Sequence, residues 1–141
     1  MEPWQIAMRY LGVPFAHCGR SRRGLDCVGL MVLVGLEWGI DVQDSPYYGR
    51  EPARNNNSFQ LRDYLERYLG PPVERPYGVN DVVLMKLRPR FAPAHVGIVA
   101  PHEHGLGLIH SYGAIGKVVL QRIDERRHSQ IIEVFQWPAK L

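Results

Sequence analysis

The chain has 141 residues, of which 45% are hydrophobic and 22% are charged, and its formal net charge is +3. That length fits a single domain, residues 1–141, with an ordinary hydrophobic core. The sequence has no apolar run of about 18 residues, and residues 1–16 lack the basic-then-apolar layout of a secretory signal. We therefore expect synthesis in the cytoplasm and no membrane insertion. Basic residues are scattered rather than interleaved with stacking aromatics, which argues against a specific nucleic-acid partner.

Helical periodicity and helix-end residues predict three helices in the first half of the chain. Pro3 suits a first helical position, and Gly12 ends the first apolar run. Asp26 is a suitable N-cap for the second helix, which Gly39 ends, and Ser58 is a suitable N-cap for the third. The predicted helices are 3–11, 27–38 and 58–69. The second is apolar nearly all round, which indicates a buried central helix.

Beyond residue 70 the pattern changes to short β-rich runs separated by turn residues. Helices first and consecutive strands afterwards predict an α+β domain, with helices packed on an antiparallel sheet of about five strands. The predicted strands are 81–85, 95–100, 106–111, 117–123 and 131–137. The irregular segment 41–57 either covers the functional site or docks onto a neighbouring protein.

Cys27 is the candidate nucleophile. It lies where a polar loop meets the second predicted helix, and the unpaired N–H groups of a helix N-terminus favour an anion. A thiol so placed can have its pKa lowered from about 8.5 to roughly 3.5–7.5, especially beside a histidine. His95 and His110 lie on two predicted strands that follow one another along the chain. A thiol facing strand-borne histidines predicts a cysteine hydrolase with a base and an orienting group.

Other polar residues have structural alternatives. Arg20 and Arg22, in the loop before Cys27, either attract a substrate carboxylate or are solvated, whereas Arg126 and Arg127 are expected to be solvated loop residues. Cys18 is expected to be structural, without a disulfide to Cys27, because no signal peptide points to an oxidising compartment. The run 102–104, two histidines and a glutamate, is expected at a hairpin tip, and we predict no metal site.

Six segments resemble the NlpC-type cell-wall cysteine peptidases, and they follow one another in the order that the family has. They are residues 10–15, 19–24, 26–30, 80–83, 95–98 and 109–112. The resemblance covers roughly residues 4–123, and the Asp-Cys and His-x-Gly-Ile blocks are fairly specific together. The loop 19–24 and the segment 93–95 are most similar to the phage-tail and gene-transfer-agent branch.

This resemblance implies a compact papain-like fold and hydrolysis of the D-glutamyl-to-diamino-acid amide in peptidoglycan stem peptides. Cys27 would be the nucleophile, His95 the general base and His110 the group that orients the base, with no metal or organic cofactor. A member of this branch would be built into a phage tail or phage-like particle together with other particle proteins. It would open the cell wall for DNA entry, which would account for the missing signal peptide.

The chain also departs from the family pattern. Phe15 stands where many members have a tyrosine that helps to hold the substrate or the oxyanion. His17 either contacts substrate, replaces the hydrogen bond of that tyrosine, or packs on the first helix. Phe15, His17, Arg20 and Arg22 are therefore the candidate substrate-binding residues. Two alternatives stay open: a catalytically silent structural tail component with the same fold, and an amidase that acts on another small amide.

Overall fold

The computed structural model describes residues 1–41, 44, 61–88 and 93–139. Its helices are α1 (Pro3–Met8), α2 (Cys27–Trp38), α3 (Leu61–Leu69) and α4 (Glu125–Gln130). Its strands are β1 (Arg20–Ser21), β2 (Gly24–Leu25), β3 (Val82–Met85), β4 (His95–His102), β5 (Gly105–Tyr112), β6 (Lys117–Arg122) and β7 (Ile131–Phe135). β1 and β2 form a small hairpin, and the other strands form a five-stranded antiparallel sheet in the order β6-β5-β4-β3-β7. The α+β class and the antiparallel sheet are confirmed.

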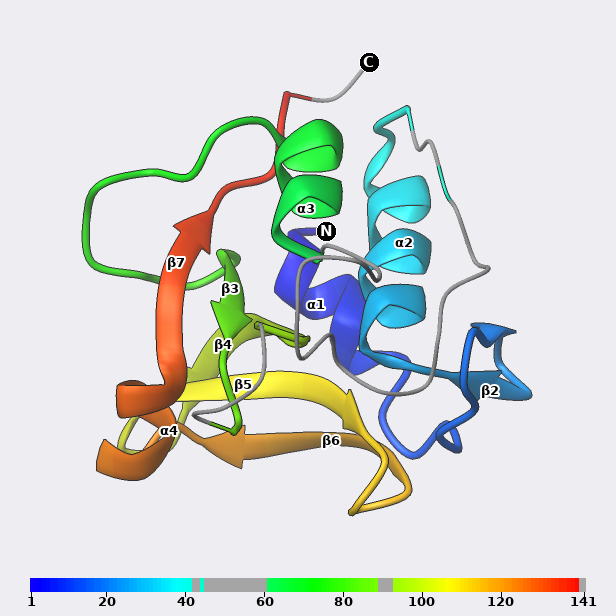
Figure 1. The fold of residues 1–141 in the computed structure, drawn as a ribbon. Coiled ribbons are helices and arrows are strands. Elements are labelled where there is room, and N and C mark those ends of the chain that lie inside the picture. The colour runs from blue at the N-terminus through cyan, green and yellow to red at the C-terminus, as the bar shows by residue number, and fades with distance from the viewer. Residues whose placement is uncertain (42–43, 45–60, 89–92, 140–141) are drawn as a thin grey trace.

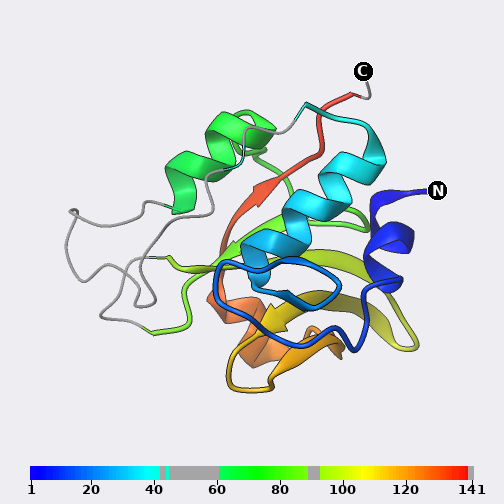
Figure 2. The same cartoon turned by 90° about the vertical axis from the view of Figure 1, so that its right-hand side faces the viewer.

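The helices α1, α2 and α3 lie on one side of the sheet, with α1 and α2 close together over its middle strands (Figures 1 and 2). The helix α4 lies apart from them, at the end of the sheet where β6 finishes and β7 starts (Figure 1). Because β6 and β7 are the two edge strands, this short connection links opposite edges of the sheet. None of the described helices is long and apolar enough to cross a membrane.

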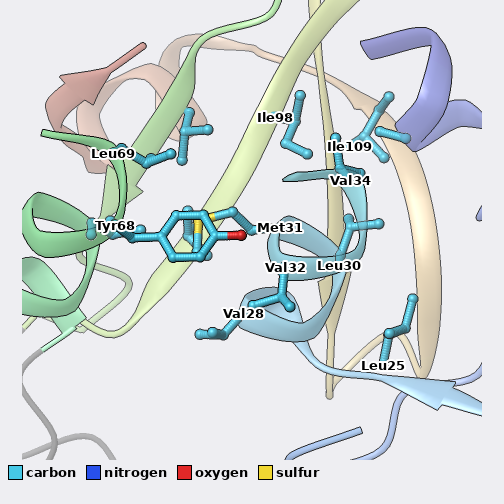
Figure 3. Close-up of a cluster of buried hydrophobic side chains, with 14 of the residues drawn as sticks. Leu25, Val28, Leu30, Met31, Val32, Val34, Tyr68, Leu69, Ile98 and Ile109 are labelled. Carbon is cyan, nitrogen blue, oxygen red and sulfur yellow. The ribbon is translucent and has the colours of Figure 1, made fainter. Parts of the chain in front are cut away.

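The main core lies between α2 and the sheet. Figure 3 shows side chains of α2, among them Leu30, Met31 and Val34, packed between the strands and α3. Ile98 on β4 and Ile109 on β5 contribute the sheet side of this core, and both are almost fully buried. A smaller apolar cluster covers part of the opposite face of the sheet, built on Val83, Met85, Val99 and Leu108. The buried central position predicted for the second helix is confirmed.

The predicted bounds of the second helix are also confirmed. The Asp26 side chain accepts a hydrogen bond from the Gly29 N–H at 2.8 Å, and Gly39 ends the helix with φ +99°. The first helix is shorter than predicted, because Tyr10 N–H binds the carbonyl three residues back and the chain tightens into turns after Met8. The predicted cap Ser58 and nearly all of the segment 41–57 lie outside the described residues.

The five predicted strands are confirmed, and each end lies within two residues of its predicted place. The predicted hairpin tip at 102–104 is also confirmed, since His102 pairs with Gly105. Two elements were not predicted: the hairpin β1–β2 and the helix α4. Asp124 caps α4 by accepting a hydrogen bond from the Arg127 N–H at 2.8 Å. With no buried residue, α4 has no apolar periodicity that sequence analysis could detect.

The packing of α2 predicts different effects for two leucines of the same helix. Leu30 is 1% exposed and Leu36 is 53% exposed. We expect Leu30→Ala to lower the free energy of unfolding by about 2–5 kcal/mol, because it leaves a cavity between helix and sheet. Leu36→Ala, the matched control, should change it by less than about 0.5 kcal/mol. Urea unfolding measures both, and equal losses would contradict this account of the core.

Candidate active site

The hydrogen-bonded ladder between β4 and β5 stops before either strand ends. Its last described pair toward the start of β4 is Ile98–Ile109, although β4 begins at His95 and β5 runs on to Tyr112. If the same register continued, Val96 would lie opposite Ser111. Instead the two strands leave a gap in which their polar backbone groups need other partners.

The start of α2 and the residues just before it lie against this gap. Val99 N–H donates to the Asp81 carbonyl on the β3 side, so by the alternation of an antiparallel strand Val96 N–H points toward β5. The Val96 backbone lies close to the Cys27 thiol and lowers its pKa. Across the gap, the buried Ser111 hydroxyl donates to the Leu25 carbonyl at 2.5 Å. The two strands thus hold the N-terminus of α2, and the thiol lies beside the residue that follows His95.

The two histidines of the strands form a pair. Nε2 of His95 lies 2.7 Å from Nδ1 of His110, and the rings meet edge to face at 67°. His110 is completely buried and His95 is 4% exposed. The ring of Tyr112 packs on both, with ring centroids 5.5 Å from His95 and 5.9 Å from His110. Nε2 of His95 is thus the ring nitrogen that is engaged with His110.

Three further residues support this pair. Oε1 of Gln121, on β6, lies 2.8 Å from Nε2 of His110. Arg127, on α4, donates to the same Oε1 at 3.4 Å and to Oε1 of Gln130 at 3.1 Å, and its guanidinium lies 5.5 Å from the centre of the Tyr112 ring. The sequence analysis missed these residues, and its assignment of Arg127 to a solvated loop is wrong because Arg127 is half-buried against Tyr112 and Gln121.

Burial keeps the thiol and both rings neutral. Desolvation, with a smaller contribution from the charge of Asp26, raises the pKa of the Cys27 thiol to about 12, although the backbone of Val96 and of the helix start acts in the opposite direction. The expectation of a lowered thiol pKa is therefore wrong, since burial outweighs the helix N-terminus. Desolvation likewise lowers the pKa of His110 to about 4 and holds the pKa of His95 well below its usual value, with the positive charge of Arg127 acting in the same direction.

Phe15 and His17, two of the predicted substrate-binding residues, lie near the nucleophile. Phe15 forms a bridge with Leu25, and its ring, 36% exposed, lies close to Gly113 just after β5. His17 lies beside Asp26, the residue before Cys27, with a ring nitrogen within 4.8 Å of its carboxylate. Both positions are compatible with contact to a substrate, and their roles stay predictions.

Arg20 and Arg22 hold structure together. Arg20 forms ion pairs with Asp26 at 3.1 Å and with Asp44 at 2.9 Å, which tie the loop to the cap of α2. Arg22 donates to the Arg9 carbonyl and stacks on Tyr10, 4.4 Å from the ring centre, at the α1 end of the loop. These contacts account for both arginines as structural residues, and contact with a substrate stays a prediction.

His17, Cys18 and Asp26 bring three potential metal ligands within 4.8 Å of one another. The carboxylate of Asp26 is already used: Oδ1 accepts from Gly29 N–H and from Arg20, and Oδ2 accepts from Cys18 N–H. A cation at this place would have to displace the guanidinium of Arg20. The arrangement is therefore that of a helix cap. Cys18 and Cys27 are not joined in a disulfide.

The raised thiol pKa predicts the pH dependence of alkylation. A raised pKa means that the thiolate is scarce near neutrality, so the rate at which iodoacetamide modifies Cys27 should rise by about tenfold per pH unit between about pH 7 and 10. Mass spectrometry of a Cys18→Ser background measures this rate without a second thiol. A rate that reaches a plateau below about pH 8 would instead show a stable thiolate–imidazolium pair and contradict the neutral resting state.

Comparisons with known proteins do not name a family for the chain. No protein-family model matches it, and a search of curated proteins finds no match.

Proposed function

We propose that the protein is a cysteine peptidase of the NlpC type, papain-like in architecture, that hydrolyses the D-glutamyl-to-diamino-acid amide of peptidoglycan stem peptides. The observation that carries this proposal is that the Cys27 thiol lies close to the backbone of Val96, the residue that follows His95, whose ring pairs with that of His110. The six motif segments that resemble the family support the substrate class.

In the proposed reaction, the sulfur of Cys27 attacks the carbonyl carbon of the amide. The thiol proton passes to Nδ1 of His95, which gives it to the nitrogen of the leaving amine as the C–N bond breaks. The product left on the protein is a thioester. A water that loses its proton to His95 then attacks the thioester, which releases the acid and restores the thiol. No metal or cofactor takes part.

The neutral resting state decides how the first step proceeds. With the thiol pKa raised and the His95 pKa lowered, a free thiolate is rare, so the proton leaves sulfur as the sulfur attacks. The imidazolium that forms beside the sulfur is then stabilised by the negative charge that develops on the substrate oxygen and sulfur. His110 accompanies this change by holding Nε2 of His95.

The backbone N–H of Cys27, at the start of α2, is the candidate donor to the oxyanion, because the first N–H groups of a helix lack intrahelical partners. Phe15 offers no hydroxyl for this purpose. We expect a polar neighbour such as His17 to contribute instead.

We further propose that the protein acts in the cell-wall space as part of a phage tail or phage-like particle, together with other particle proteins. The likeness of the loop 19–24 and of the segment 93–95 to that branch supports this role. Such a particle would deliver the peptidase to the wall, where its action opens a path for DNA.

Digestion of purified peptidoglycan tests the activity. The wild type should release fragments with new D-glutamyl carboxyl termini, and Cys27→Ala or His95→Ala should lower the release by at least about 10³-fold, because each removes a group that takes part in proton transfer or attack. Liquid chromatography with mass spectrometry identifies the fragments.

The matched control is Cys18→Ala, which removes the other thiol and should leave the release unchanged. Circular dichroism of each variant verifies that it is folded. A folded wild type that releases nothing, or a Cys27→Ala variant as active as the wild type, would overturn the proposal.

A further inference from the structure

We propose that Gln121 is a positioning residue: its amide oxygen fixes the proton positions of His110 and, through His110, of His95, so that Nδ1 of His95 carries no proton. The part of this inference that concerns reaction rate rests on the proposed function. The part that concerns proton positions does not.

The geometry is a continuous chain of hydrogen bonds across three neighbouring strands. Oε1 of Gln121 lies 2.8 Å from Nε2 of His110, and Nδ1 of His110 lies 2.7 Å from Nε2 of His95. Because His110 is completely buried, these two partners account for both of its ring nitrogens. The side chains share one face of the sheet, since His110 pairs with Val119, two residues before Gln121.

Arg127 identifies the atom of Gln121 that faces His110. A guanidinium only donates hydrogen bonds, and Arg127 Nη2 donates to the same atom of Gln121, at 3.4 Å, that meets Nε2 of His110. That atom must therefore be the amide oxygen. Arg127 is itself held by Gln130 and by its place over the Tyr112 ring.

The proton positions follow from this orientation. An amide oxygen only accepts, so Nε2 of His110 must carry a proton and donate. Burial keeps His110 neutral, which leaves its Nδ1 without a proton and able only to accept. Nε2 of His95 must then donate to it, and neutral His95 has its bare nitrogen at Nδ1. The opposite set of protons would put a proton on Nδ1 of His95, which could then not accept the thiol proton.

The charge of Arg127 adds to this effect. It lowers the pKa of both rings and so opposes an extra proton that would remove the acceptor at Nδ1 of His95. No acidic group offsets it in the hydrogen-bonded chain, whose members beyond the two rings are the neutral Gln121 and Arg127 itself. Gln121 and Arg127 thus set the proton positions and the charge of the His95 and His110 rings.

Two substitutions separate acceptor chemistry from packing. Gln121→Met keeps a long unbranched side chain but removes the oxygen, whereas Gln121→Glu keeps an acceptor toward both His110 and Arg127. Gln130→Met is the matched control, because it makes the same chemical change at the other glutamine that binds Arg127 but does not contact His110. Urea unfolding of each variant measures any loss of stability.

Two-bond ¹H–¹⁵N correlation spectra of ¹⁵N-histidine-labelled protein near neutral pH report which ring nitrogen carries the proton. We expect Nε2–H for both His95 and His110 in the wild type, in Gln121→Glu and in Gln130→Met. In Gln121→Met we expect loss of that single form, with Nδ1–H populated at one or both rings. An Nδ1–H form of His95 in the wild type, or unchanged spectra in Gln121→Met, would overturn the inference.

The rate of stem-peptide hydrolysis gives the second readout. Loss of proton control in a Ser-His-Asp triad lowers kcat by about 10⁴-fold, and since Gln121 acts one residue further away we expect Gln121→Met to lower kcat by about 10- to 100-fold with KM little changed. Gln121→Glu should restore most of the activity. If the wild type hydrolyses nothing, the proposed function fails while the spectra still decide the inference. If Gln121→Met is as active as the wild type, the inference fails and the proposed function stands.

Discussion

The stopped ladder between β4 and β5 is the constraint on which the site depends. Two central strands of a sheet normally satisfy each other, and leaving buried backbone groups unpaired costs about 1–3 kcal/mol each. Here the start of α2 lies against that gap: the Val96 backbone lies close to the Cys27 thiol, and the Ser111 side chain donates to the Leu25 carbonyl. The contacts that join α2 to the two strands therefore also set the position of the thiol.

The site is built in layers behind the thiol, each from a different element. β4 and β5 supply the histidine pair, β6 supplies Gln121, and α4 brings Arg127 over the ring of Tyr112. Burial keeps the thiol of Cys27 and the rings of His95 and His110 neutral at rest. Arg127, which is half-exposed, carries the positive charge of the series. A neutral site of this kind stores no ion pair. In the proposed reaction, charge separation arises only when a substrate supplies a developing anion.

Local signals in the sequence were enough for α2, because Asp26 and Gly39 each act within a few residues of the helix end. Alternation was enough for the strands, and their order brought His95 and His110 onto neighbours. Gln121 could not be identified, because a polar residue on an edge strand is ordinary. Its contact with His110 depends on the register of β6 with β5. Arg127 depends on α4, whose six residues carry no apolar pattern. The direction of the Cys27 pKa shift depends on burial, which only the tertiary packing determines.

The central claim is that the substrate becomes bonded to the sulfur of Cys27. Mass analysis of acid-quenched protein tests this claim most directly. The protein is mixed with a stem peptide that contains the D-glutamyl-to-diamino-acid amide, quenched at short times, and digested for peptide mapping. The account predicts a transient mass increase equal to the acyl part of the peptide, located on Cys27. Product formation with no adduct at any time, or an adduct on Cys18, would contradict it.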